Sequence, residues 1–305
     1  MFVELLEIFG KIFLMIGYGY LLYKKKVIQE PMKACLTTLL MKVVVPISIL
    51  SAANHEFSRQ KAEGMLFSAV AITLYYVISL VLVSALSGRL GLEERKRKAL
   101  INLAVFANVG FIGFPLAEEL FGADGTMGTV IYNMIYQLFF FSYGVYLYSG
   151  RKEFHLSDML KNVVTLACLG TVILFLSPFR FPAFVQSAMS SVGGMMVPVS
   201  MILIGCEIAK ADFRKVITDR WGYLVSFFRL VAAPLVIFLI LKAVGAKGPY
   251  AANFLVISGL PSASLNVIMA QEHRCEPEFA ASAVTQSMVW MVATAPVVVM
   301  LAQRL

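Results

Sequence analysis

Charged residues are scarce in this chain. Asp, Glu, Lys and Arg make up 14% of it, against about one quarter in soluble globular domains. Hydrophobic residues make up 59%, and the mean hydropathy is +0.80. Too few polar residues are available to cover a water-soluble core, so we predict an all-α integral membrane protein. No long hydrophilic or low-complexity stretch interrupts the apolar segments, so no appended soluble module is expected.

Cysteine and histidine are also few, and their spacing excludes the common metal sites. The four cysteines form no CxxC pair, and the three histidines fall in separate loops or helix ends. A zinc site and any other metal site are therefore not expected. A P-loop, a dinucleotide-binding glycine pattern and a GxSxG elbow are also missing from the sequence. The chain is predicted to be neither an ATPase nor another enzyme, and to need no cofactor.

Long apolar runs dominate what is there. A spanning helix needs about 20 mostly apolar residues, and the sequence divides into about ten such runs. The predicted spans are 4–23, 33–54, 65–87, 99–121, 127–149, 162–179, 187–209, 222–244, 250–271 and 279–302.

Basic residues follow alternate spans, which predicts the orientation in the membrane. Four loops are rich in Lys and Arg: 24–33, 89–98, 151–161 and 210–220. The loops between them carry few, and the loop before the last span offers only Arg274. The net charge of +8 therefore fits the positive-inside rule better than a nucleic-acid partner. We expect a multi-pass membrane protein, in contact with lipid, with both termini outside.

Two of the spans contain a Gly-x-Pro sequence, at Gly113 to Pro115 and at Gly259 to Pro261. Proline removes a backbone donor inside a membrane helix, and hydrocarbon cannot satisfy the carbonyl that is left. A break at corresponding places in two halves of a chain is typical of a transporter whose site lies between two discontinuous helices. We therefore predict that Pro115 and Pro261 break their helices and that the two breaks lie together near the midplane.

The halves also resemble each other in order. Val-Pro-Ile-Ser ends at Ser48 in the second span, and Val-Pro-Val-Ser ends at Ser200 in the seventh. Five spans per half reverse the orientation of the second half, so 1–150 and 151–305 are predicted to be inverted repeats. Any single match could arise by chance, because proline and small residues are common in membrane helices.

Small and polar residues surround both breaks. Amide and hydroxyl groups could bind a solute, glycines allow close backbone approach, and a half-helix N-terminus favours a carboxylate. The alternative is that the same residues serve only helix packing. The candidate solute-binding residues are Asn108, Gly110, Gly113, Pro115, Gly259, Pro261, Ser262, Ser264 and Asn266.

Charges inside spans are costly, so each is a candidate for function. Lys42 precedes Pro46, Arg229 precedes Pro234, and Glu118 follows the first Gly-x-Pro. Lys42 can extend its amine to the membrane surface, in which case it needs no role in transport. Arg229 could pair with a carboxylate or hold a helix, and Glu118 could couple protons.

The run Asn108-Val-Gly-Phe-Ile-Gly-Phe-Pro115 resembles the fourth-helix motif of the auxin efflux carrier family, which includes plant PIN carriers and bacterial permeases. Leu260-Pro-Ser-Ala-Ser264 and Arg229 with Pro234 resemble its ninth and eighth helices. The resemblance implies ten helices in two inverted five-helix repeats, with the fourth and ninth crossing, in a bacterial inner membrane. It also implies a scaffold of spans one, two, six and seven, a mobile transport domain of the other six, and a homodimer formed through the scaffold.

Substrates in that family are small organic anions such as auxins, and dicarboxylates are suspected among bacterial relatives. This chain has Asn266 where plant carriers have a second proline, which puts auxin itself in doubt. We therefore predict a secondary carrier of a small organic anion that works by alternating access. Uniport, proton coupling and sodium coupling all stay open, as does a symporter of another solute class. A receptor or intramembrane enzyme is the alternative class; the first would need a signalling domain and the second converging catalytic groups, and the sequence has neither.

Overall fold

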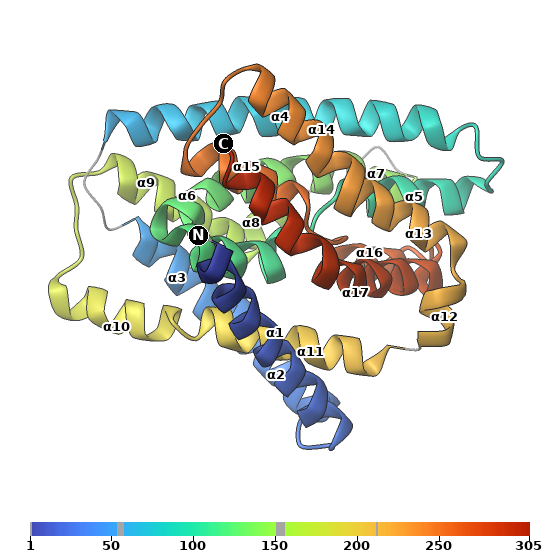
Figure 1. Cartoon of the computed structure of the whole chain (residues 1–305), viewed down its shortest axis with the longest axis horizontal. Helices are drawn as coiled ribbons and strands as arrows, with labels where there is room; N and C mark the ends of the chain where they lie inside the picture. The colour runs from blue at the N-terminus through green and yellow to red at the C-terminus, as the bar shows by residue number, and fades with distance from the viewer. Residues whose placement is uncertain (1, 54–57, 151–155, 212) are drawn as a thin grey trace.

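The computed structural model describes residues 2–53, 58–150, 156–211 and 213–305. Part of the predicted basic loop at 151–161 lies outside these residues, and so do His55 and His155. The described residues form helices joined by short connections, together with one isolated β-bridge. Figure 1 shows α4 (Arg59–Ser87) along one long edge of the molecule, and α10 (Ala183–Gly193) and α11 (Met196–Lys210) along the opposite edge.

Six helical runs among the described residues are long and apolar enough to cross a membrane, as expected of a membrane protein. They are Glu30–Ala52, Arg59–Ser87, Val109–Ser149, Ala183–Lys210, Arg220–Ala243 and Pro277–Ala302. The helix α1 (Phe2–Lys24) and the shorter apolar helix α9 (Val163–Leu176) accompany them.

The fourth and ninth predicted spans are each split into two helices. The fourth consists of α5 (Glu94–Val105), then η2 (Val109–Gly113) leading into α6 (Phe114–Phe139). The ninth consists of α15 (Pro249–Ser258) and α16 (Leu265–Glu272). The π-turn η3 (Phe140–Gly144) and α7 (Val145–Ser149) continue α6.

Gly122 explains why α6 contains parts of two predicted spans. Its φ of 58° and ψ of −143° are not helical, and a residue with a side chain rarely adopts them. The chain turns here, and the Thr126 hydroxyl on one side donates to the Glu118 carboxylate on the other. The fourth predicted span therefore ends at this turn and the fifth begins after it.

Pro115 does not break its helix, so the predicted position of the first break is wrong. The break lies at residues 106–108, and Pro115 lies in the first turn of α6, directly after the π-turn η2. In that turn the Phe114 N–H donates to the Val109 carbonyl, five residues back. The wider turn accommodates a residue without an N–H inside a continuous helical run.

The same arrangement recurs at two other prolines. The π-turn η1 (Leu40–Val44) ends two residues before Pro46, at the start of α3 (Val45–Ala52). The π-turn η4 (Phe228–Ala232) ends two residues before Pro234, between α13 (Arg220–Phe227) and α14 (Ala233–Ala243). Pro261 is different, because it lies in the non-helical connection of residues 259–264, where a break was predicted.

The helices pack in two groups. In one, α1 lies along α11, while α3 contacts α9 and α10. In the other, α4 packs on α5 and α6, and α17 (Pro277–Ala302) packs on α13 and α15. A buried apolar cluster joins the groups, with Phe114 and Val130 of α6 packed against residues of α3, α9 and α11. The short helices α2 (Glu30–Leu39), α8 (Leu156–Lys161) and α12 (Phe213–Thr218) complete the described chain.

Three of the predicted basic loops lie at the same end of the helices. Lys210 at the end of α11 pairs with Glu30 at the start of α2, at 3.2 Å. The α12 helix that follows α11 contacts α17, where the Val216 carbonyl accepts from Gln286 at 2.7 Å. The Lys96 ammonium of α5 lies 5.0 Å from the ring centroid of Phe279 in α17. The 24–33, 89–98 and 210–220 loops therefore lie at one end of the helices.

Candidate functional site

The two breaks meet and pair as short extended segments. Ala107 and Ser262 form an isolated antiparallel bridge. The Asn108 N–H donates to the Pro261 carbonyl at 2.9 Å, and the Ala263 N–H donates to the Phe106 carbonyl at 2.9 Å. Each break thus satisfies backbone groups that the other exposes, which is what an apolar surrounding requires. The breaks therefore form one crossing.

Two half-helices begin at this crossing. Asn108 caps η2, since its Oδ1 accepts from the Phe111 N–H at 3.2 Å. Its Nδ2 donates to the Ser264 hydroxyl at 3.0 Å, next to the first residue of α16. Asn108 and Ser264 thus link the two half-helix N-termini, where partial positive charge gathers. Ser264 is partly exposed, whereas Asn108 is 4% exposed.

Two half-helices also end at the crossing, and Arg229 of η4 binds both ends. Its Nη1 donates to the Val105 carbonyl at 3.1 Å, at the last residue of α5. Its Nη2 donates to the Ser258 carbonyl at 3.0 Å, at the last residue of α15. Nε and Nη2 both donate to the Leu260 carbonyl, at 3.1 and 2.9 Å. The guanidinium thus joins the half-helix C-termini.

Tyr75 of α4 takes the remaining guanidinium N–H. Nη1 of Arg229 donates to the Tyr75 hydroxyl at 2.7 Å. A guanidinium has five N–H donors, and these contacts use all of them. Arg229 is fully buried, at 0% exposure. It therefore has no donor left for a solute in this conformation.

The remaining candidates of the second break are buried around this pairing. The Ser262 hydroxyl donates to the Leu103 carbonyl, and its N–H donates to the Ser287 hydroxyl of α17 at 3.1 Å. Gly259 lies against Val298 and Pro234, so a side chain there would meet both. Ser262 and Gly259 therefore serve the packing of the crossing in the conformation described here.

The glycines of the first break lie beside two different neighbours. Gly113 faces Ile257 and Leu260 of the second break, whereas Gly110 faces Met41 of η1. Gly110 is partly exposed and Gly113 is buried. Gly110 therefore marks the side of the crossing that meets the other group of helices.

Asn266 belongs to a separate buried hydrogen-bond network next to the crossing. Its Oδ1 accepts from the Tyr148 hydroxyl at 3.3 Å, and its Nδ2 donates to the Asn102 carbonyl at 3.5 Å. Asn102 in turn donates from Nδ2 to the Gly144 carbonyl at 2.9 Å. Asn266 has 0% exposure, so a solute would have to displace these contacts to reach it.

The three predicted coupling residues are not brought together. Lys42 is exposed on η1, Glu118 lies at the turn with Thr126, and Arg229 is enclosed at the crossing. No hydrogen bond or ion pair joins any two of them within the described residues. Glu119 beside Glu118 instead pairs with Lys11 of α1, which links the two groups of helices.

Tyr75, Asn102, Tyr148 and Ser287 were missed by sequence reasoning. Asn102 carried a usable signal, because it is an amide inside an apolar run near the end of α5. Tyr75 carried none, since tyrosines are frequent in this chain and its partner lies 154 positions away.

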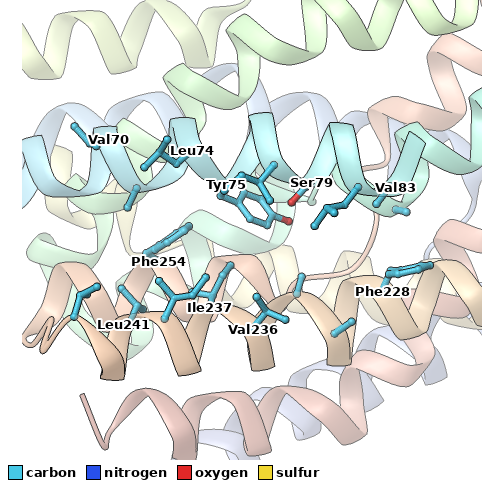
Figure 2. Close-up of a pocket in the computed structure, with 18 of the residues that line it drawn as sticks. Val70, Leu74, Tyr75, Ser79, Val83, Phe228, Val236, Ile237, Leu241 and Phe254 are labelled. Carbon is cyan, nitrogen blue, oxygen red and sulfur yellow. The ribbon is translucent and has the colours of Figure 1, made fainter. Parts of the chain in front are cut away.

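An apolar groove of about 400 Å³ runs between α4 and α14. Figure 2 shows Tyr75 of α4 projecting into this groove, with Phe254 of α15 and Ile237 of α14 across from it. Among the described residues that line the groove, only Ser79 and Tyr75 carry hydroxyl groups. The groove is unsuited to a small anion, and neither Asn108 nor Ser264 lines it.

Comparison with known proteins identifies the family. The sequence matches the family model described as "Membrane transport protein" over residues 5–162 and 154–299. The chain belongs to this family, the auxin efflux carrier family.

Two archaeal proteins resemble the chain over most of its length. One is an uncharacterized transporter of Methanocaldococcus jannaschii, 22% identical over 261 residues, which cover 81% of this chain and 83% of that protein. Another is an uncharacterized transporter of Methanothermobacter thermautotrophicus, 23% identical over 283 residues, which cover 91% and 92%.

Proposed function

We propose that this membrane transport protein is a secondary carrier of a small organic anion, bound at the crossing of the two broken helices. The observation that carries the proposal is the pairing of Asn108 with Ser264 where two half-helices begin. Half-helix N-termini and an amide donor can hold a carboxylate without a buried lysine or arginine as its partner. Moderate affinity of this kind suits a solute that must be released.

Binding requires movement, because the crossing is nearly closed. Asn108 is 4% exposed, and Gly110 lies under Met41 of η1. We propose that the group containing α4, α5, α6, α13, α15 and α17 slides against the group containing α1, α3, α9, α10 and α11. Such a motion would open the crossing to each side in turn, in the manner of an elevator. Apolar side chains fill much of the boundary between the groups, which supports sliding, because apolar contacts have no preferred direction.

The finer architecture belongs to the same proposal. We infer ten spans in two inverted repeats, with 1–150 and 151–305 as the halves and a dimer formed through the first group. The basic loops would face the cytoplasm, which places both termini outside. Labelling of intact cells tests this orientation: a cysteine at Arg95 should react with an impermeant maleimide only after permeabilisation, and one at Ala123 before it.

The test of function is uptake into proteoliposomes with Asn108→Ala. A panel of radiolabelled mono- and dicarboxylates is assayed, with Asn253→Ala and Cys168→Ala as controls. Asn253 is also a buried amide, but it bonds Thr129 at 3.2 Å and not the crossing. Loss of one hydrogen bond to a charged ligand is worth about 1.5 to 3 kcal/mol, so affinity should fall about tenfold to a hundredfold.

The controls should transport like the parent protein. Equal transport by Asn108→Ala and the parent would place the solute elsewhere. Uptake that is absent for every carboxylate, with another solute class transported, would contradict the anion assignment.

A further inference from the structure

Arg229 is a full positive charge with no carboxylate among its partners. Every group it contacts is a neutral oxygen: three backbone carbonyls and one phenol. An isolated charge in an apolar interior is strongly disfavoured, so something must balance it. No residue of opposite charge does so among the described contacts of Arg229.

The two half-helix ends supply the balance. An α-helix carries about half a negative charge at its C-terminus. Arg229 binds the last residues of α5 and α15, so two such ends, about one negative charge together, converge on one guanidinium. The carbonyls at Val105, Ser258 and Leu260 are free to accept from Arg229 because the helices stop there and no backbone N–H of a following turn donates to them.

Carbonyls at half-helix ends are what sodium-coupled carriers use to bind their ion. In this protein, carbonyl oxygens of the same kind accept hydrogen bonds from the Arg229 side chain. We propose that Arg229 is a positioning residue: a built-in cation that occupies the place of a transported one and holds the crossing together. Only the N-terminal ends, at Asn108 and Ser264, are then left to bind the anion.

The test is chemical rescue of Arg229→Ala with free guanidinium, in the full-length protein purified in detergent. Peptide-level hydrogen exchange reports the amides of Asn108 and Ala263, which donate across the crossing. Without Arg229 these amides should exchange about tenfold faster or more, whereas the contact of α1 with α11 should keep its protection. Guanidinium chloride at low millimolar concentration should restore the slow exchange. Equal concentrations of urea or sodium chloride are the controls.

Two further measurements test the proposal even if Arg229→Ala does not fold. Arg229→Lys keeps the charge but has fewer donors, so its protection at the crossing should lie between the parent and the alanine variant. The parent protein should have the same melting temperature in sodium, potassium and choline chloride, because its carbonyls are already bound.

Parent-like exchange in Arg229→Ala overturns the proposal. Loosening of the whole protein that guanidinium does not reverse also overturns it, as does a sodium-specific rise in melting temperature. The inference rests on the proposed function only in what it says of the anion. The exchange measurements need no solute, so their failure is distinct from a failure of transport.

Discussion

The two sides of the crossing differ in which groups bind the partial charges of the half-helix ends. On the C-terminal side, four guanidinium hydrogen bonds bind carbonyls at the ends of α5 and α15, a fifth binds Tyr75, and Arg229 is completely buried. On the N-terminal side, one amide and one hydroxyl join the starts of η2 and α16, and Ser264 is partly exposed. The C-terminal side therefore stabilises the fold, and the N-terminal side is left to bind the solute. Substitutions on the C-terminal side should lower the stability of the protein, and substitutions on the N-terminal side should lower its affinity for the solute.

The largest stability effect among conservative variants is expected for Tyr75→Phe. It removes the acceptor of one Arg229 N–H and leaves that donor buried without a partner. A lost hydrogen bond to a charged group costs about 1.5 to 3 kcal/mol. The melting temperature in detergent should fall, while the affinity for a transported carboxylate should stay the same.

Tyr76→Phe is the matched control, because it removes the hydroxyl of the next residue. The Tyr76 side chain is also fully buried, but its hydroxyl makes no hydrogen bond among the described residues. Its removal should leave the melting temperature almost unchanged. Equal losses in the two variants would mean that the contact with Arg229 contributes nothing.

A smaller loss of stability is expected for Asn266→Ala. The amide makes two buried contacts, to Tyr148 and to the Asn102 carbonyl, and each is long. Their removal should cost about 1 to 2 kcal/mol in unfolding free energy, measured by denaturant titration. Solute affinity should change less than twofold. A large loss of affinity with parent-like stability would return Asn266 to the solute site, where sequence reasoning placed it.

The smallest effect is expected for Ser264→Ala, on the N-terminal side. The hydroxyl accepts from Asn108 and lies at the surface of the crossing. Loss of one neutral hydrogen bond is worth about 0.5 to 1.5 kcal/mol, so carboxylate affinity should fall about two- to tenfold. Ser262→Ala is the comparison, since its hydroxyl is buried on Leu103. A greater loss of affinity for Ser262→Ala than for Ser264→Ala would reverse the order.

The positions of the long apolar helices could largely be read from hydropathy, because a span is defined by its own residues. The connection at 259–264 was also predictable, since Gly259 and Pro261 both disfavour a helix and the chain is not helical there. The break at 106–108 was not. Nothing in Phe106 or Ala107 opposes a helix, and the segment is extended because it pairs with Ser262 and its neighbours.

Pro115 misled the prediction for a physical reason. A proline removes one N–H, but a π-turn before it can absorb the defect within a continuous helix. Sequence alone does not say which solution a given proline takes. The candidates Asn108, Ser262, Ser264 and Arg229 do meet at the crossing, whereas Glu118 and Lys42 do not. The pairing of Arg229 with Tyr75 depends on tertiary packing and could not be derived.

The most direct test of the central claim is carboxylate binding by Asn108→Asp. The substitution nearly keeps the shape of the side chain, Asp caps a helix as well as Asn, and the two half-helix N-termini at this position offset the burial of its charge, so folding should survive. A thermal-shift screen against small mono- and dicarboxylates compares it with the parent protein. At least one carboxylate should raise the melting temperature of the parent by mass action. In the variant, repulsion by the new carboxylate should weaken that binding about a hundredfold or more and abolish the shift. An equal shift in both proteins would contradict an anion site at the crossing.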